Sequence, residues 1–341
     1  MTFVYPDHVF MVAELSANHG GSLDVCLETV RAAHAAGADA IKLQTYTADG
    51  ITLDCRTPPF QIKDGTLWDG TTLHDLYLLA QTPWEWHAPI QAEARRLGLA
   101  FFSSPFDFAA VDFLEAMDVP IFKIASFEIA DIPLIEYAAS KGRAMIMSTG
   151  IASLGDIEEA IAACHRQGNH DITLLKCTSA YPASPSDANL ATLPVWARTF
   201  GLRIGLSDHT MDNAVAITAV ALGARVIEKH FILDRAIGGP DASFSLTPEE
   251  FAALVQGVRV AELAIGGVQS GPTGQALINR RFGRSLFIAE DMKAGDFLTA
   301  GNLRSVRPGD GLHPRHYREL LGRPLRCDAG KGTPMAWSMV D

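Results

Sequence analysis

The chain has 341 residues, of which 48% are hydrophobic and 20% are charged, and its formal net charge at pH 7 is -11. A chain of this length and composition can bury a full core, so we expect a globular protein with one large and one small domain. The acidic excess argues against nucleic acid or an anionic membrane surface as the main partner. An anionic small substrate remains compatible with it, because a few lysines in a pocket can reverse the local field.

The amino-terminal segment and the cysteines narrow the class further. Residues 1–15 lack the basic start and apolar stretch of a secretory signal, and no run reaches the roughly 18 apolar residues that a membrane span needs. We therefore expect a cytoplasmic protein with no membrane partner. The five scattered cysteines include no CxxC pair and predict neither a disulfide framework nor a thiolate zinc site.

Short apolar runs recur along the chain and alternate with segments of helical spacing. The runs cover residues 9–15, 39–44, 100–104, 121–126, 144–149, 172–178, 203–208 and 225–230. The helical segments lie between Ser22 and Gly37 and over residues 84–97, 108–117, 132–140, 154–167, 213–222 and 248–265. This alternation predicts a parallel sheet, either closed or open and doubly wound. Because the runs number eight and no GxGxxG or GxxxxGK[ST] fingerprint follows the first run, we predict an α/β fold with a (β/α)8 TIM barrel.

Three segments fall outside this alternation. Residues 47–82, between the second run and its helix, form a long insertion that we interpret as a partial lid. A glycine-rich linker at 267–283 separates the predicted barrel domain, residues 1–266, from a segment of short strands and turns at 284–341. Because roughly sixty residues is near the lower limit for independent stability, we expect this segment to pack against a barrel, its own or a neighbour's.

Polar side chains end most of the apolar runs, and in a TIM barrel these ends converge on one mouth. Lys42 and Lys123 are candidate clamps for a phosphate or carboxylate group. Each could instead be a Schiff-base nucleophile or the ion-pair partner of a nearby acid. The hydroxyl and amide groups that could complete an anion cradle are those of Gln44, Ser104, Ser126, Ser148 and Ser207.

Two histidines and three glutamates complete the candidate site. His209 and His230 follow neighbouring runs, and neighbouring strands lie about 4.8 Å apart, so both imidazoles can reach one metal ion. Glu14, Glu128 and Glu228 are candidate acid or base groups. Each glutamate could equally be a structural ion-pair partner of the lysines.

Several motifs in this order resemble those of the sialic acid synthases. They are AELSANHGGS at 13–22, KLQT at 42–45, FSSPF at 102–106, KIAS at 123–126, MSTG at 147–150, GLSDHT at 205–210 and EKHF at 228–231. The match spans nearly the whole chain, and the final segment is similar to the C-terminal antifreeze-like (SAF) domain of that family. The resemblance implies a TIM barrel followed by a small β-rich SAF domain.

The resemblance also implies a reaction and the residues that carry it. Family members condense phosphoenolpyruvate with an open-chain acetamido sugar and water and release phosphate, using a divalent metal such as Mn²⁺ or Mg²⁺ that His209 and His230 would hold. By matching position, Glu14 and Asp241 would lie toward the sugar, with Glu128 and Glu228 near the reacting centre. The residues implied in substrate binding are Lys42, Gln44, Ser104, Lys123, Ser126, Ser148, Ser179, Tyr181, Ser207, Asp241 and Arg307. Arg307 matches an arginine that reaches from the SAF domain into the partner's barrel, which implies a domain-swapped homodimer.

Within the family, the motifs are most similar to those of the pseudaminic acid synthases. The stretches that carry this likeness are LY at 76–77, TPWEWH at 82–87, ASFE at 125–128, KCTSAYP at 176–182 and GGPDASFSL at 238–246. Ser179 stands where sialic acid synthases typically have an asparagine. N-Acetylneuraminic acid and legionaminic acid stay open as alternative products, because remote pocket contacts worth a few kcal/mol decide such choices. A metal-independent Schiff-base aldolase and a noncatalytic sugar-binding protein are the rival functions.

Overall fold

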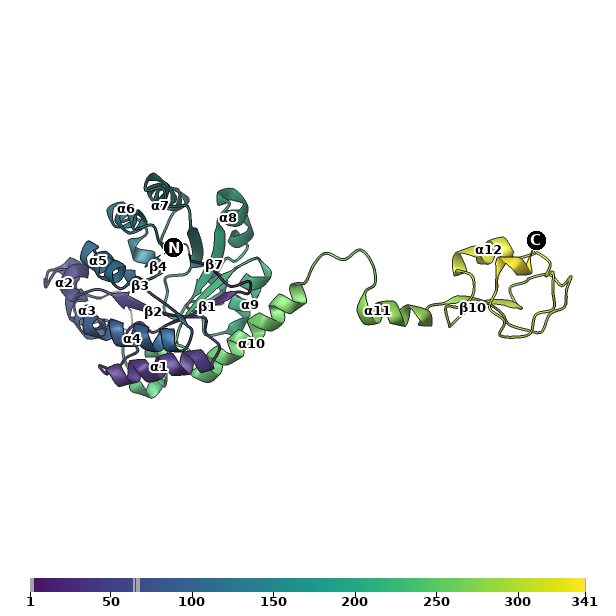
Figure 1. Ribbon diagram of the computed structural model, residues 1–341, viewed down its shortest axis with the longest axis horizontal. Coiled ribbons are helices and arrows are strands. Elements are labelled where there is room, and N and C mark those ends of the chain that lie inside the picture. The colour runs from purple at the N-terminus through teal and green to yellow at the C-terminus, as the bar shows by residue number, and fades with distance from the viewer. Residues whose placement is uncertain (1–2, 64, 66–67, 341) are drawn as a thin grey trace. The chain divides into compact units, whose positions relative to one another are not determined.

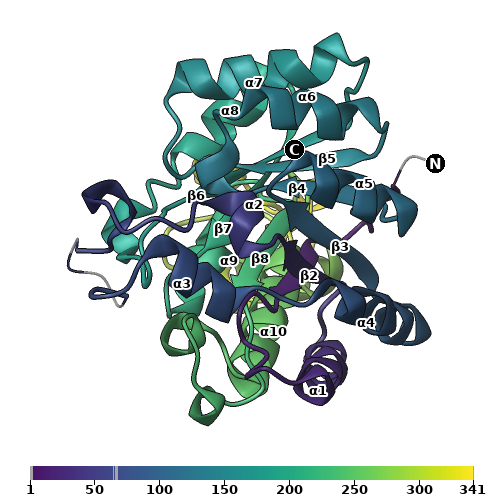
Figure 2. The ribbon, with the colours of Figure 1, turned by 90° about the vertical axis from the view of Figure 1, so that its left-hand side faces the viewer.

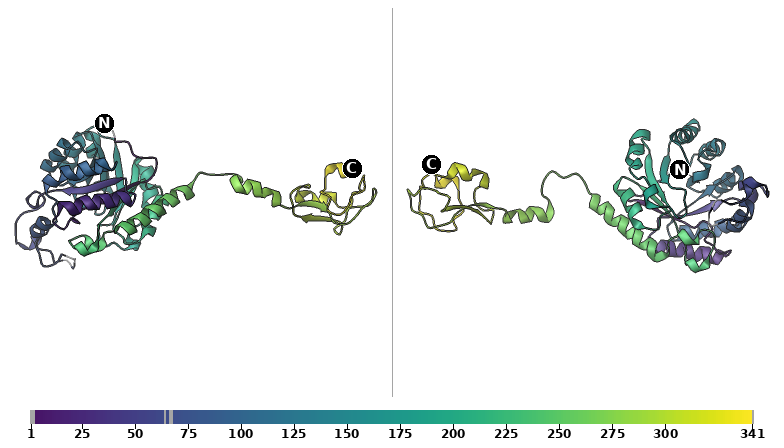
Figure 3. Two further views of the ribbon diagram at one scale, coloured as in Figure 1. Left: turned by 60° about the horizontal axis from the view of Figure 1, so that its bottom comes forward. Right: turned by 180° about the vertical axis from the view of Figure 1, so that it is seen from behind.

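The chain is organised in two compact units. A computed structural model describes residues 3–63, 65 and 68–340. Unit 1 is Met1–Gly266 and unit 2 is Gly267–Asp341 (Figure 1). Figure 3 shows each unit from two further sides.

Unit 1 is a closed barrel. Its eight parallel strands, counted over the described residues, pair in chain order, and β8 returns to pair with β1. The strands are β1 Phe10–Glu14, β2 Ala40–Thr45, β3 Ala100–Pro105, β4 Ile121–Ile124, β5 Ala144–Ser148, β6 Ile172–Cys177, β7 Arg203–Asp208 and β8 Val226–His230. The predicted TIM barrel is therefore confirmed.

Helices follow the strands and cover the outside of the barrel (Figure 2). They are α1 Leu23–Ala35, α4 Trp84–Arg96, α5 Phe108–Ala116, α6 Ile132–Ser140, α7 Leu154–Arg166, α8 Thr192–Phe200, α9 Asn213–Ala221 and α10 Pro248–Ile265. Side chains at their N-caps, such as Ser22 before α1 and Ser153 before α7, accept hydrogen bonds from first-turn amides. None of the helices within the described ranges combines the length and apolar character of a membrane-spanning segment.

The observed bounds of the predicted strands and helices lie close to the sequence-based ones, with one omission. The sequence pattern did not predict α8, which has Pro194 in its first turn and no side-chain hydrogen bond at its N-cap Ala191. A proline is tolerated there because first-turn amides have no intrahelical acceptor. The insertion at 47–82 contains the short helices α2 Ala48–Ile51 and α3 Leu73–Ala80. Leu67, an apolar residue of that insertion, lies outside the described residues.

The barrel core has two layers because successive side chains of a strand face opposite sides. Outward-facing residues such as Ile41 and Leu43 pack against the helices. Inward-facing residues such as Phe10, Val12 and Phe102 fill the lumen at the amino-terminal ends of the strands. The chain before β1 packs against this end, where Phe3 and Tyr5 contact Phe10.

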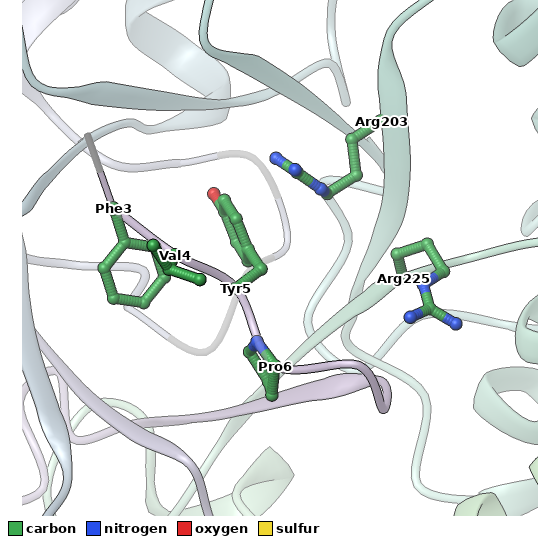
Figure 4. Close-up of a pocket in the computed structure, with 6 residues that line it drawn as sticks. All are labelled: Phe3, Val4, Tyr5, Pro6, Arg203 and Arg225. Carbon is green, nitrogen blue, oxygen red and sulfur yellow. The ribbon is translucent and has the colours of Figure 1, made fainter.

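A shallow pocket lies on this amino-terminal side of the barrel (Figure 4). Phe3, Tyr5, Arg203 and Arg225 are among the residues that line it. The Arg203 guanidinium stacks over the Tyr5 ring at 3.8 Å, and Arg225 donates to the Asp7 carbonyl. The pocket therefore lies at the opposite end of the strands from the predicted active site. Its two arginines bind the chain before β1, through Tyr5 and Asp7.

Unit 2 is built from short elements. Its strands β9 Ser285–Ile288 and β10 Leu303–Val306 are antiparallel, and its helices are α11 Gly274–Asn279 and α12 Tyr317–Leu320. Two similar turn sequences of this unit, DMKAG at 291–295 and DAGKG at 328–332, pair with each other: Asp328 binds Lys293 at 2.7 Å, and Asp291 accepts from the Lys331 amide at 2.8 Å. These bonds join the two turns. The buried core of unit 2 includes Leu286, Leu298 and Leu325.

Candidate active site

The side chains inside the barrel change from apolar to ionisable toward the carboxyl ends of the strands. On β1 the inward positions run Phe10, Val12, Glu14, and on β8 they run Val226, Glu228, His230. On β2 and β4 the same face carries Lys42 and Lys123. The predicted convergence of polar strand ends on one site is therefore observed.

Four buried charges form a continuous network across the lumen. The Lys42 ammonium lies 2.9 Å from Glu14 and 3.4 Å from Glu228, and Lys123 lies 3.8 Å from Glu228. All four side chains are at most 7% exposed. Lys42 and Lys123 thus approach the same carboxylate, and the lumen brings these two predicted lysines together.

The lysines and carboxylates of this network shift one another's pKa values. Burial acts to lower the pKa of Lys42, but the carboxylates of Glu14 and Glu228 raise it above its usual value. Burial raises the pKa of Glu14 to about 7. For Glu228, burial acts to raise the pKa, but the ammonium groups of Lys123 and Lys42 hold it below its usual value. In the free protein the carboxylates of Glu14 and Glu228 therefore offset part of the positive charge of the two lysines.

Polar groups extend this network toward the predicted anion cradle. Lys123 donates to the Ser148 hydroxyl at 2.7 Å, and Lys42 donates to Ser104 at 3.4 Å. The Ser207 hydroxyl donates to Glu228 at 3.3 Å. Gln44 donates its amide to Glu14 at 3.2 Å. Burial lowers the pKa of Lys123, so its ammonium depends on these neighbours.

A second pair of hydroxyls lies next to Gly150. Ser179 donates to Ser126 at 2.9 Å, and both lie against the Gly150 backbone. A Cβ at Gly150 would overlap the Ser179 hydroxyl and lie 2.5 Å from the Ser126 hydroxyl. The glycine therefore permits a close approach of backbone and hydroxyl donors, which suits an oxyanion.

Glu128 lies just beyond β4, in a single turn Ser126–Glu128. Its Oε2 is buried and has no hydrogen-bond partner among the described residues. Burial raises the pKa of Glu128 to about 7, while the nearby Lys123 charge acts against this. A carboxyl group with such a pKa can both take up and release a proton near neutral pH.

The two histidines face each other at the ends of β7 and β8. Their ring centroids are 5.4 Å apart. His209 Nδ1 lies 2.9 Å from the Thr178 carbonyl oxygen, so in the neutral ring Nδ1 carries the proton and Nε2 has the free lone pair. His230 Nδ1 is buried without a hydrogen-bond partner in the described part of the chain, and burial holds the pKa of His230 well below its usual value.

This arrangement fits a divalent cation as two imidazole ligands. A neutral ring with an unused nitrogen is the form that binds metal, and a carbonyl acceptor on the other nitrogen is a common orienting contact. No cluster of three or more His, Cys, Asp or Glu side chains placed to hold a metal occurs within residues 3–63, 65 and 68–340. The remaining ligands would have to be oxygens of substrate or water, which Mn²⁺ and Mg²⁺ accept.

Loops after β6 and β8 surround the histidine pair. The Tyr181 ring lies 4.4 Å from the His209 ring, and Asp241 Oδ2 lies 3.7 Å from His230 Nδ1. Trp68 of the insertion donates its indole N–H to the Pro240 carbonyl at 3.3 Å and lies 6.2 Å from the Tyr181 ring. The insertion therefore contacts the loops of the site, although its role as a lid stays a prediction.

One predicted site residue belongs to unit 2, and two residues of the barrel motifs have contacts that the sequence did not predict. Arg307 follows β10 in unit 2, where its side chain is exposed. Gly150 and Lys229 are parts of the MSTG and EKHF motifs but were assigned no role. Their contacts depend on strand register, which the sequence pattern alone does not supply.

The comparisons with known proteins agree with this geometry. The NeuB family model matches residues 29–270, and the SAF domain model matches residues 283–341. A pseudaminic acid synthase from Helicobacter pylori is 44% identical, with 96% of each chain covered, and one from Campylobacter jejuni is 46% identical, covering 94% of this chain and 93% of that one. The crystal structure of an N-acetylneuraminic acid synthetase from Leptospira borgpetersenii superimposes with a TM-score of 0.72 at 31% identity, covering 81% of this chain and 92% of that chain. The chain therefore belongs to the NeuB family, the sialic acid synthase family that its motifs resemble.

Proposed function

We propose that this chain is a pseudaminic acid synthase. It condenses phosphoenolpyruvate with the open-chain form of 2,4-diacetamido-2,4,6-trideoxy-altropyranose and water, giving pseudaminic acid and phosphate. The observation that carries the proposal is one lumen in which lysines and hydroxyls suited to an anion adjoin a histidine pair suited to a cation. The 44% and 46% identity to pseudaminic acid synthases over nearly the whole chain supports this particular product.

Phosphoenolpyruvate binds at the lysine end of the lumen. Lys42 and Lys123 hold its phosphate and carboxylate, and the neighbouring donors fix their orientation. The remaining groups of this cradle are Gln44, Ser104, Ser126, Ser148 and Ser207. Because Glu14 and Glu228 already compensate the lysines, an incoming anion must replace part of these ion pairs.

His209 and His230 would hold a divalent cation, Mn²⁺ or Mg²⁺. The chemistry supplied there would be Lewis-acid polarisation of the sugar aldehyde. The lumen carries the carboxyl groups of Glu14, Glu128 and Glu228 against two lysines, so a divalent charge suits the electrostatic balance once an anionic substrate enters.

The reaction joins carbon 3 of phosphoenolpyruvate to the aldehyde carbon, while water adds at carbon 2. Phosphate then leaves with cleavage of its bond to carbon 2. Glu128 or Glu14 positions the water and accepts its proton, since burial raises the pKa of each group to about 7. Lys123 and Ser148, which bind each other at 2.7 Å, stabilise the departing phosphate.

The sugar occupies the loop side of the site. Tyr181 provides an aromatic surface beside the histidine rings, and Asp241 accepts from the Ala17 amide, which fixes it near His230. Ser179 replaces the asparagine typical of sialic acid synthases and offers a smaller donor to the acetamido groups. The sugar-binding set is thus Glu14, Ser179, Tyr181 and Asp241.

The active form is a domain-swapped homodimer in the cytoplasm. In this arrangement the SAF unit of one chain brings Arg307 to the barrel of its partner, where a guanidinium can bind a carboxylate or phosphate. The exposed Arg307 side chain and the flexible composition of the linker support this assignment.

The direct test is incubation of the metal-loaded enzyme with phosphoenolpyruvate and a panel of acetamido sugars. We expect phosphate release and a product with the mass of pseudaminic acid only with the 2,4-diacetamido-6-deoxy sugar of altro configuration. Preference for N-acetylmannosamine or the legionaminic acid precursor would assign the chain to one of those synthases. Binding of sugar without phosphate release would indicate a noncatalytic protein.

A Schiff-base aldolase is the rival mechanism, and Lys123 is its candidate nucleophile because burial lowers the Lys123 pKa. That enzyme would be trapped covalently by borohydride with substrate and would keep its activity after chelation. We expect no trapping and a loss of activity on chelation.

A further inference from the structure

Asp208 and Lys229 form an ion pair directly behind the histidine pair. They are register neighbours at the ends of β7 and β8, with Nζ 2.7 Å from Oδ2 and both side chains 1% exposed. Their preceding neighbours Ser207 and Glu228 bind each other inside the lumen, so Asp208 and Lys229 face outward, under the helices. The pair therefore touches none of the lumen groups assigned to substrates.

The ion pair also fixes the backbone that follows His209. Asp208 Oδ1 accepts from the Thr210 amide at 2.9 Å and from its hydroxyl at 2.8 Å. Lys229 donates to the Thr210 carbonyl. The Thr210 backbone is thus bound at both its N–H and its C=O, and no side-chain atom of Asp208 or Lys229 is among the buried unsatisfied atoms found in the described residues.

Charges are unusual at this level of the barrel. The outward-facing residues near the ends of β2, β4 and β5 include the apolar Leu43, Ile124 and Met147. Lys176 on β6 also faces outward, but it is only half-buried and donates to a backbone carbonyl. A well-packed apolar pair is often as stabilising as a buried ion pair, because the charges must be taken out of water. Net stability is therefore a weak reason for an ion pair at this place, beyond the Thr210 backbone that it binds.

Their place in the chain supplies a reason. Asp208 immediately precedes His209, and Lys229 immediately precedes His230, so the ion pair ties together the two segments that carry the imidazoles. The His209 ring also has the Thr178 carbonyl to orient it, whereas His230 Nδ1 has no hydrogen bond within the described chain. The position of His230 thus depends on its backbone, on ring packing against Phe244 and Tyr181, and on Asp241 at 3.7 Å.

We propose that Asp208 and Lys229 are positioning residues that hold His209 and His230 at the spacing required by a divalent cation. This inference rests on the proposed function, in which the two histidines bind the metal. The pairing has a second effect, since an uncompensated Lys229 ammonium beside His230 would repel a cation. Asp208 therefore both anchors the strand ends and cancels that charge.

The test measures Mn²⁺ binding itself, by following the electron paramagnetic resonance signal of free Mn²⁺ during titration of the purified full chain. The main variant is Asp208→Leu with Lys229→Met, which removes both charges together and leaves no orphaned ion. Asp208→Asn is the second variant, because it keeps an oxygen for Thr210 and removes only the charge. Thermal unfolding of each variant identifies those that are folded.

We expect the Kd for Mn²⁺ to rise tenfold or more in the folded double variant, as is typical when orienting contacts behind metal ligands are lost, and to rise also in Asp208→Asn. The matched control is Asp39→Leu with Arg259→Met, which removes a 3.1 Å ion pair at the amino-terminal end of the barrel. This control should lower the melting temperature without changing the Kd.

The outcomes separate the two proposals. A wild-type chain that binds no Mn²⁺ would contradict the proposed metal site. A wild-type chain that binds Mn²⁺, with folded variants whose Kd stays within twofold of it, would overturn the positioning role of Asp208 and Lys229 alone.

Discussion

The ammonium group of Lys42 lies 2.9 Å from a carboxylate oxygen of Glu14, with both side chains sealed inside the barrel. Because Lys42 also contacts Glu228, this one cation separates two carboxylates that would otherwise face each other. The lumen is therefore an ion-pair network that substrate must enter, and its lysines bear on both stability and catalysis.

The first prediction concerns this network. Lys42→Met should destabilise the free protein by about 3–5 kcal/mol, because it leaves buried carboxylates without their counter-charge. Adding Glu14→Gln should restore most of that stability, yet the double variant should release no phosphate from phosphoenolpyruvate. Denaturant unfolding and a phosphate assay measure the two effects separately. A stable and active Lys42→Met variant would contradict the assignment of Lys42.

Metal removal gives the second prediction. Exhaustive chelation should abolish phosphate release, and added Mn²⁺ or Mg²⁺ should restore it. His209→Ala should lower kcat by a factor of about 10³ or more without recovery by metal, since it removes one of two imidazole ligands. His8→Ala, which alters an exposed histidine paired with Asp39 at 2.8 Å, is the control and should keep full activity. Activity that survives complete metal removal would count against the mechanism.

The third prediction tests the cradle beside Gly150. In Gly150→Ala the new methyl group must displace the hydroxyls of Ser126 and Ser179. We therefore expect the KM for phosphoenolpyruvate, which Ser126 binds, and the KM for the sugar, which Ser179 binds, each to rise about tenfold, on the basis of one or two lost hydrogen bonds. Gly155→Ala is the matched control, because Gly155 lies in α7 and its added Cβ would approach no atom closer than 3.7 Å. The control should stabilise the protein by up to about 1 kcal/mol and leave KM unchanged. Equal KM values for both variants would remove the cradle from the substrate site.

The fourth prediction follows from the pKa of Glu128, which burial raises from 4.5 to about 7. Between these two pH values the unfolded chain loses a proton that the folded protein keeps, so the stabilising effect of the protonated group is lost as pH rises. Glu128→Gln cannot titrate, and its stability relative to wild type should increase from pH 4.5 to pH 7 by about 1–3 kcal/mol, then level off. Urea unfolding at several pH values measures this difference, with Glu158→Gln on the exposed side of α7 as control. A difference that stays flat across this range would show that Glu128 titrates normally.

The sequence predicts the barrel well because the periodicity that marks each element is local. Strand 203–208 and helix 132–140 match the observed bounds, whereas α8 was missed because Pro194 and an uncapped start hide its pattern. For the site, the polar ends of the strands were enough to bring Lys42 and Lys123 together in the prediction.

The pairing of charges was not predictable in the same way. The ion pairs of Lys42 with Glu14 and of Lys229 with Asp208 join different strands, so they depend on strand register and on which face each residue takes. A shift of β8 by one residue in its register would turn Lys229 into the lumen. The sequence does not give the register of β8, so the ion pairs of the site, and with them its electrostatic balance, could be assigned only from the structure.

The last prediction tests whether Arg307 acts on the partner's barrel. Neither His209→Ala nor Arg307→Ala should be active alone, but an unfolded and refolded equimolar mixture should recover about a quarter of wild-type activity, because half of the dimers are mixed and each has one intact site. If Arg307 served the barrel of its own chain, a mixed dimer would hold no complete site and the mixture would stay inactive. Arg304→Ala, which alters the exposed strand arginine just before, is the control and should be active on its own. Size-exclusion chromatography with light scattering checks that each variant is a dimer, and a fully active monomer would contradict the swapped arrangement.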